Sequence, residues 1–226
     1  MRLDQLKRKV SNFYKLANSL DNNMADAEKL PANTKDTDTL LKNLSSLNTF
    51  KARIEYAEGN LERLSSGSSR VVFETNDGFI LKLAKNEKGI AQNGVEGNPK
   101  IKSKHVNGAI KTDQDDKWIL ADKAEKINEE EFKDLTGLDF EDFEESIRFA
   151  LKKISGSDKE KPKCFEKVKS NDFFQDIYET GLEFDLIPGD LAKISSFKKI
   201  KDRVVLVDAG LTREIFEEFY ESDSET

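Results

Sequence analysis

With 226 residues, of which 36% are charged and 36% hydrophobic, the chain can form one domain of moderate size or two small ones. Its formal net charge of −7, with no strongly basic region, argues against binding to nucleic acid or to an anionic membrane surface. Cys164 is the single cysteine, which excludes an internal disulfide and suits a reducing cytoplasm. His105 is the single histidine, which excludes the usual His-rich zinc sites. It also excludes a His-dependent catalytic triad unless His105 is itself the catalytic histidine.

Residues 1–60 predict an N-terminal helical hairpin. From residue 1 to about residue 20, apolar side chains recur at alternating spacings of three and four, the pattern of a helix–helix seam. A second helical pattern begins with Thr37 or Asp38 as its N-cap. This arm either buries its own seam, packs on the next domain, or serves as a docking or oligomerisation module. No apolar run in the chain approaches about 20 residues and the N-terminus lacks a signal peptide's apolar block, so no membrane span is expected.

Residues 64–83 predict three strands. Asn76, Asp77 and Gly78 separate two apolar, β-branched runs, and such turns are a strong hairpin signal because they need positive φ angles. Lys82 is the charged member of the last, otherwise apolar strand, so it either reaches solvent at an edge or holds a partner. A short helix follows, with Glu96 near its C-terminal end, fourteen residues after Lys82.

Two more strand-like runs, 105–112 and 117–121, complete a five-stranded antiparallel region. After residue 122 the apolar period changes from 2 to 3.6. The helices expected there cover residues 129–135, 139–154 and 171–181, and the closing strands cover 184–187, 197–200 and 204–207. Asp190 and Asp208 lie at the ends of the last β segments, eighteen residues apart.

Several short motifs, in this order, resemble the signature of protein kinases. The stretch 65–72 (SSGSSRVV) lies where the glycine-rich loop would fall, with only Gly67 and Val72 matching, and 79–82 (FILK) is similar to the strand that carries the kinase lysine. The stretch 187–191 (IPGDL) is similar to the catalytic loop without its histidine, and 208–210 (DAG) is similar to D-F-G. The resemblance covers about residues 62–212, and residues 81–93 also resemble short kinase-like proteins of tailed bacteriophages.

The resemblance implies an α+β protein with a two-lobed, protein-kinase-like fold. Residues 1–60 would form the N-terminal helical arm, residues 61–122 a five-stranded antiparallel N-lobe, and residues 123–226 a truncated helical C-lobe. Only sixteen residues follow Gly210, which leaves no A-P-E segment and no room for a full peptide-substrate lobe.

The resemblance also implies roles for particular residues, with ATP and Mg²⁺ as cofactors. Lys82 would contact the α- and β-phosphates, Glu96 would hold Lys82, and Asp190 would take the proton of the acceptor hydroxyl. Asp208 would bind Mg²⁺, with Ser195 as a weaker second ligand where kinases have asparagine. The nucleotide would be bound by Ser66, Gly67, Ser68, Ser69, Lys82, Asp122 and Ala124, the last two at the adenine edge.

Two functions follow from the resemblance. The chain is either an ATP- and Mg²⁺-dependent phosphotransferase acting on a protein or small-molecule hydroxyl, or a pseudokinase that serves as a nucleotide-binding or structural interaction module. Arg70, which replaces a loop glycine, either contacts phosphates or fills the pocket. An unrelated α+β binding protein is the third alternative. A cytoplasmic location is expected, in the host cytoplasm if a phage encodes the protein, with an unidentified protein partner that binds through residues 1–60.

Overall fold

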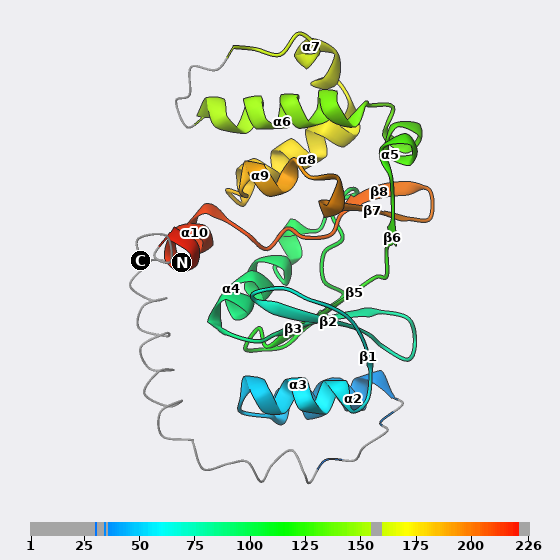
Figure 1. Cartoon of the computed structure of the whole chain (residues 1–226), viewed down its shortest axis with the longest axis vertical. Coiled ribbons are helices and arrows are strands. Elements are labelled where there is room, and N and C mark those ends of the chain that lie inside the picture. The colour runs from blue at the N-terminus through cyan, green and yellow to red at the C-terminus, as the bar shows by residue number, and fades with distance from the viewer. Residues whose placement is uncertain (1–29, 31–33, 35, 155–159, 222–226) are drawn as a thin grey trace. The chain divides into compact units, whose positions relative to one another are not determined.

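The structure is a computed structural model that describes residues 30, 34, 36–154 and 160–221 (Figure 1). Its contacts divide the chain into two compact units, residues 1–60 and residues 61–226. The predicted helix over residues 1–20 lies outside the described residues. A boundary between lobes at residue 122 stays a prediction. Among the described helices, none combines the length and the apolar character needed to cross a membrane.

The first unit contains two short helices where the sequence suggested one continuous pattern. Helix α2 spans Thr37–Ser46 and helix α3 spans Phe50–Glu58. The break occurs because Leu47 is extended and the Thr49 side chain accepts a hydrogen bond from the amide of Ala52, which starts a new helix. Arg53 joins the two helices, since its Nη1 donates to the Leu47 carbonyl at 2.9 Å.

The second unit begins with the predicted five-stranded antiparallel sheet. The strands are β1 (Glu62–Ser66), β2 (Arg70–Glu74), β3 (Ile80–Ala84), β4 (Lys111–Thr112) and β5 (Trp118–Ala121), in the order β1-β2-β3-β5-β4. Gly78, at φ +83°, makes the turn between β2 and β3. In the central strand, Lys82 pairs with Val72 on one side and Ile119 on the other. Strand β4 is shorter than the predicted run 105–112, because His105 and Asn107 bond to the backbone of Leu206 instead.

Helix α4 (Glu87–Glu96) packs on this sheet (Figure 1). The Asn86 side chain caps it by accepting from the amide of Gly89. A Cβ at position 89 would lie 2.3 Å from the Ser69 carbonyl oxygen and 3.0 Å from Ala84, so glycine is what allows helix and sheet to approach this closely. The 3-10 turn η2 (Pro99–Ile101) follows the helix.

A second, three-stranded antiparallel sheet contains β6 (Glu125–Lys126), β7 (Phe197–Ile200) and β8 (Arg203–Leu206). The helices that follow in the chain are α5 (Glu129–Thr136), α6 (Phe140–Ile154), α7 (Phe165–Val168), α8 (Asp172–Glu183), α9 (Pro188–Leu191) and α10 (Arg213–Phe216), with η3 (Ile194–Ser196) and η4 (Glu217–Glu221). The predicted strand 184–187 is wrong: Leu186 makes only an isolated bridge to Thr212, because α8 continues to Glu183.

Phenylalanines fill the core of this helical part. Phe132 lies at its centre, fully buried, with ring centroids of its four aromatic neighbours between 5.1 and 5.7 Å away. These neighbours are Phe140, Phe143, Phe173 and Phe197. Three of the four pairs are edge-to-face, and such pairs add about 0.5–1.5 kcal/mol each beyond their buried area. Since Phe197 starts β7, the core fixes the strands β7 and β8 that lead to Asp208.

Candidate functional site

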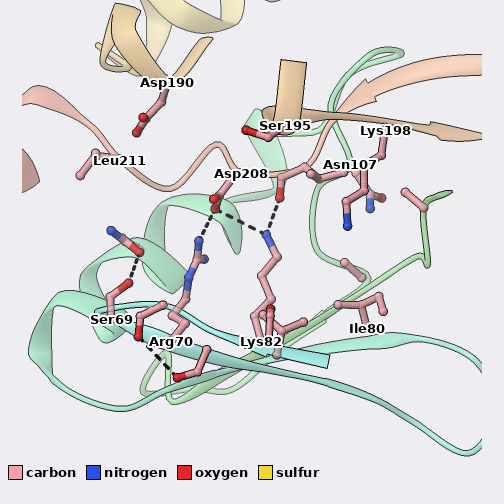
Figure 2. A pocket seen from close by; sticks show the side chains of 18 of the residues that line it. Ser69, Arg70, Ile80, Lys82, Asn107, Asp190, Ser195, Lys198, Asp208 and Leu211 are labelled. Atoms are coloured by element: carbon pink, nitrogen blue, oxygen red, sulfur yellow. Dashed lines mark hydrogen bonds and ion pairs between the residues drawn. The ribbon is translucent and has the colours of Figure 1, made fainter. Parts of the chain in front are cut away.

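A pocket of about 530 Å³ lies between the five-stranded sheet and the segment from Asp190 to Leu211 (Figure 2). The β1–β2 turn forms one rim, and β2 and β3 contribute Val72, Ile80 and Lys82. Ten of the site residues predicted from sequence line it: Ser66, Gly67, Ser68, Ser69, Lys82, Asp122, Ala124, Asp190, Ser195 and Asp208. Glu96, the remaining one, is buried and reaches the pocket through its contacts with Lys82 and Arg70.

Lys82 connects three elements at one atom. Its Nζ lies 2.5 Å from Oε2 of Glu96 on α4 and donates a hydrogen bond to the carbonyl of Val207, directly after β8. The side chain is 11% exposed and that of Glu96 only 4%. A buried pair such as this holds its geometry because either partner, left alone, would be an unpaired buried charge.

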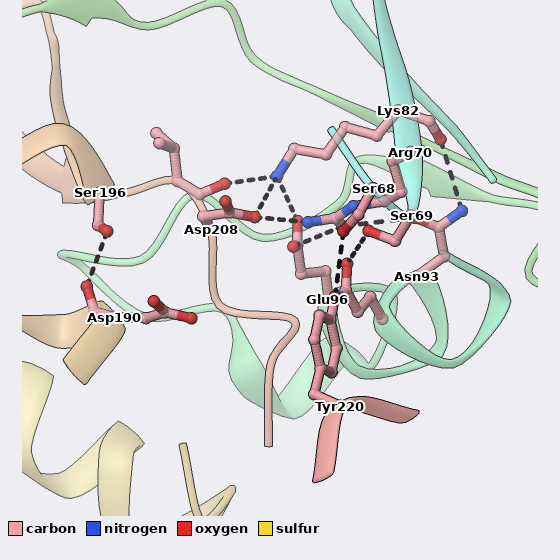
Figure 3. Close-up of polar contacts among 12 residues, drawn as sticks. Ser68, Ser69, Arg70, Lys82, Asn93, Glu96, Asp190, Ser196, Asp208 and Tyr220 are labelled. Atoms are coloured by element: carbon pink, nitrogen blue, oxygen red, sulfur yellow. Dashed lines mark hydrogen bonds and ion pairs between the residues drawn. The ribbon is translucent and has the colours of Figure 1, made fainter. Parts of the chain in front are cut away.

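Arg70 completes a four-residue charge network that the sequence did not reveal (Figure 3). Its Nη1 lies 2.7 Å from Oε1 of Glu96, and its Nη2 lies 2.5 Å from Oδ1 of Asp208. Lys82 Nζ is 4.0 Å from the same Asp208 oxygen. Two cations and two carboxylates therefore alternate around the end of the pocket. The only sequence signal was an arginine at a position where the kinase loop has glycine.

The network shifts the pKa values of Arg70 and Asp208. Burial lowers the pKa of Arg70, but the charges of Glu96 and Asp208 outweigh it, so the pKa is raised above its ordinary value. Desolvation inside the pocket raises the pKa of Asp208, but the charges of Lys82 and Arg70 lower it by more, so the pKa falls below its ordinary value. Both shifts favour the charged forms of Arg70 and Asp208.

The segment 208–210 lies directly against α4. A Cβ at Gly210 would lie 2.8 Å from Oε1 of Glu96 and 2.9 Å from the carbonyl oxygen of Gln92. Ala209, where the resemblance would place an aromatic residue, is buried at 3% exposure. The lack of a side chain at Gly210 thus permits Asp208 and Glu96 to share the same cations.

Asp190 and Ser195 lie across the pocket from this network (Figure 2). Asp190 is in α9, where its Oδ1 accepts from Nζ of Lys193 at 2.5 Å. Its backbone carbonyl accepts a hydrogen bond from the Ser196 hydroxyl at 2.7 Å. Asp190 is therefore held in place by two residues that follow its helix, Lys193 and Ser196.

The contacts of Asp208 do not fit a divalent cation. Its Oδ1 already lies against Arg70 and Lys82, and a bound dication would be repelled by both. In the part of the chain that the structure describes, no three His, Cys, Asp or Glu side chains gather into a group that could hold a metal ion. The predicted pairing of Asp208 with Ser195 as metal ligands stays a prediction.

Three further residues shape the pocket without having been singled out in the sequence. Lys198 on β7 faces it, and burial, together with the charges of Lys82 and Lys126, lowers the pKa of its ammonium. The Asn107 side chain donates to the carbonyl of Asp122 at 2.9 Å and fixes the segment after β5. Tyr220 closes the rim, its hydroxyl 3.3 Å from Nε2 of Gln92.

No protein-family model and no curated protein matches the sequence. Among solved structures, the chain is similar to APH(2'')-IIa in its ternary complex with streptomycin and ATP, with 14% identity and a TM-score of 0.30. It is also similar to the aminoglycoside phosphotransferase APH(2'')-Ib with ADP bound, with 15% identity and a TM-score of 0.31. Each alignment covers 67% of this chain, and the chain spans 65% of the length of either structure.

Proposed function

We propose that residues 61–226 form a small kinase-like domain that binds ATP and transfers its terminal phosphoryl group to a hydroxyl group. The observation that carries this proposal is that side chains from distant segments of the chain meet at one pocket. Lys82, Asp190 and Asp208, from β3, α9 and the end of β8, face one pocket below the serine-rich turn, and Glu96 holds the lysine. The antiparallel sheet followed by a helical part agrees with the fold that the sequence motifs imply.

The pocket has the chemistry that a nucleotide needs. Its volume of about 530 Å³ lies within the usual range for small-molecule sites, about 300–1,000 Å³. Apolar side chains from four segments would contact the base: Val72, Ile80, Ala121 and Leu211. Lys82, Arg70 and Lys198 supply positive charge for the phosphates, and the backbone amides of the turn 66–69 would cover them. The backbone at Asp122 and Ala124 would meet the edge of the base.

The proposed reaction assigns one chemical step to Asp190. The carboxylate takes the proton of the acceptor hydroxyl, whose oxygen forms a bond to the γ-phosphorus. The bond from that phosphorus to the β–γ bridging oxygen breaks, and ADP leaves with the electron pair. Lys193, 2.5 Å from Asp190, orients the carboxylate. The acceptor would be a protein or small-molecule hydroxyl.

Two measurements test this proposal on the full chain. Calorimetry with ATP and ADP should detect binding at one site, and incubation with γ-labelled ATP should release or transfer the label. Lys82→Met should abolish binding, and Asp190→Asn should preserve binding but abolish transfer. Lys100→Met and Asp202→Asn are matched controls, because both residues are exposed and neither lines the pocket. A wild-type chain that binds neither nucleotide contradicts the proposal.

A second candidate is a pseudokinase that binds the nucleotide without transferring phosphate. The contact between Arg70 and Asp208 favours it, because it occupies the carboxylate that a kinase uses for its metal ion. Tight binding without any transfer or hydrolysis would select this candidate. In either case we propose that the arm, residues 1–60, binds an unidentified protein partner. The cytoplasmic location and the likeness to phage proteins stay predictions.

A further inference from the structure

Arg70 is buried in the pocket and contacts two carboxylates. It is the first residue of β2, its side chain is 9% exposed, and both of its terminal nitrogens bind carboxylates. Nη1 binds Glu96, and Nη2 binds Asp208. A buried guanidinium in contact with two carboxylates is a fixed part of the site, because moving it would leave both anions undercompensated.

The charges of the network balance without a metal ion. Arg70 and Lys82 contribute two positive charges, and Glu96 and Asp208 contribute two negative charges. A dication at Asp208 would add two positive charges within a few ångströms of both cations. The carboxylate therefore already receives the compensation that a metal ion would otherwise supply.

The guanidinium also has the donors that a phosphate requires. Arginine carries five N–H groups in a planar fork that matches phosphate oxygens. Its contacts to Glu96 and Asp208, together with a longer one to Asn93, leave the second N–H of Nη2 unused within the described part of the chain. Arg70 lines the pocket beside the serine-rich turn, where the phosphates would lie.

We propose that Arg70 takes the place of a divalent cation at Asp208, so that the pocket binds the phosphates of ADP or ATP through Arg70 and Lys82 without a bound metal ion. This inference rests on the proposed nucleotide binding, but not on phosphoryl transfer. The sequence resemblance alone implies the opposite, a magnesium ion on Asp208.

Calorimetric titration of the wild-type chain with ADP, in EDTA and in excess Mg²⁺, tests the inference directly. Binding in EDTA that Mg²⁺ leaves unchanged, or weakens by sequestering free ADP, supports it. Binding that Mg²⁺ strengthens tenfold or more overturns it, while the proposed nucleotide binding stands. Absence of binding under both conditions means instead that the proposed function itself fails.

Variants at position 70 assign the effect to this side chain. Arg70→Ala should weaken ADP binding in EDTA by at least about tenfold and should make binding respond to Mg²⁺, because Asp208 then loses its closest cation. Arg70→Lys should lose less ADP affinity than Arg70→Ala, because lysine keeps the positive charge. It should still bind more weakly than wild type, because lysine lacks the planar, forked donors of the guanidinium. Arg203→Ala, an exposed arginine on β8, is the control and should bind like wild type. Unchanged binding by folded Arg70→Ala overturns the inference. If Arg70→Ala does not fold, the titration of Arg70→Lys and that of the wild-type chain in EDTA and in Mg²⁺ still decide whether the inference holds.

Discussion

The ammonium of Lys82 lies 2.5 Å from the Glu96 carboxylate, and it also donates to the carbonyl of Val207. One side-chain nitrogen thereby joins the central strand of the five-stranded sheet, the helix packed on that sheet, and the segment that leads to Asp208. The relationship makes the site and the stability of residues 61–226 interdependent.

Replacing Lys82 should cost stability as well as binding. Lys82→Met leaves Glu96, 4% exposed, with Arg70 as its only cation among the described residues, so the free energy of unfolding should fall by about 3 kcal/mol or more. Urea denaturation followed by circular dichroism measures this. Lys123→Met, which breaks an ion pair with Glu74 at a lysine that is half exposed, should cost less than about 1 kcal/mol. Equal losses of unfolding free energy in the two variants would contradict the conclusion that Lys82 and Glu96 form a buried ion pair.

Gly210 should not tolerate a side chain. Gly210→Ala places a methyl group 2.8 Å from Glu96 Oε1 and 2.9 Å from the Gln92 carbonyl oxygen, so the segment must shift. We expect a loss of about 1–3 kcal/mol in the free energy of unfolding, together with weaker ADP binding. Gly189→Ala, whose nearest neighbour would be Ile187 at 3.9 Å, should fold like wild type. A fully stable Gly210→Ala would show that α4 and the segment 208–210 are not in close contact.

Stability should depend on pH through Asp208. Because its pKa is lower in the folded chain than in the unfolded chain, its ionised form stabilises the fold above the ordinary pKa of about 3.9. This contribution is lost as the pH falls from that value through the lower folded pKa. The difference in unfolding free energy between wild type and Asp208→Asn should therefore be constant from pH 7 to about pH 5 and shrink below pH 4. A difference that is constant down to pH 3 would contradict the pairing with Arg70 and Lys82.

Lys198 should contribute to nucleotide binding although the sequence gives it no role. Its ammonium lines the pocket, and a charged hydrogen bond to a phosphate is worth about 1.5–3 kcal/mol. Lys198→Ala should therefore weaken ADP binding about tenfold or more in calorimetry, without loss of stability. Lys100→Ala, an exposed lysine outside the pocket, should have no effect. Wild-type affinity in Lys198→Ala would place the phosphates elsewhere.

Local signals in the sequence predicted the parts of the fold that depend on local chemistry. The turn at Asn76, Asp77 and Gly78 identified the β2–β3 hairpin, because glycine at the positive φ angle is a local requirement. The lone charged residue in an apolar strand marked Lys82 as either reaching solvent or holding a partner, and the structure gives it Glu96 as that partner. The error at 184–187 arose because a short apolar run can end a helix as well as form a strand.

Interactions between distant segments were beyond prediction from composition and spacing. Arg70 and Asp208 are 138 residues apart, and neither residue alone indicates the other. The break between α2 and α3 depends on Thr49, which caps the start of α3. The apolar pattern runs through this position and therefore suggested one continuous helix. Strand β7 carries two adjacent lysines, Lys198 and Lys199. Only the fold shows that Lys198 is the one that faces the pocket.

Calorimetric titration of the full chain with ADP in EDTA tests the central claim most directly, because the proposed binding and catalytic roles of Lys82, Arg70 and Asp190 all require a nucleotide in this pocket. Saturable binding at one site, lost in Lys82→Met and retained in Lys100→Met, is the predicted result. No binding by the folded wild-type chain, in EDTA or with Mg²⁺ added, would contradict it.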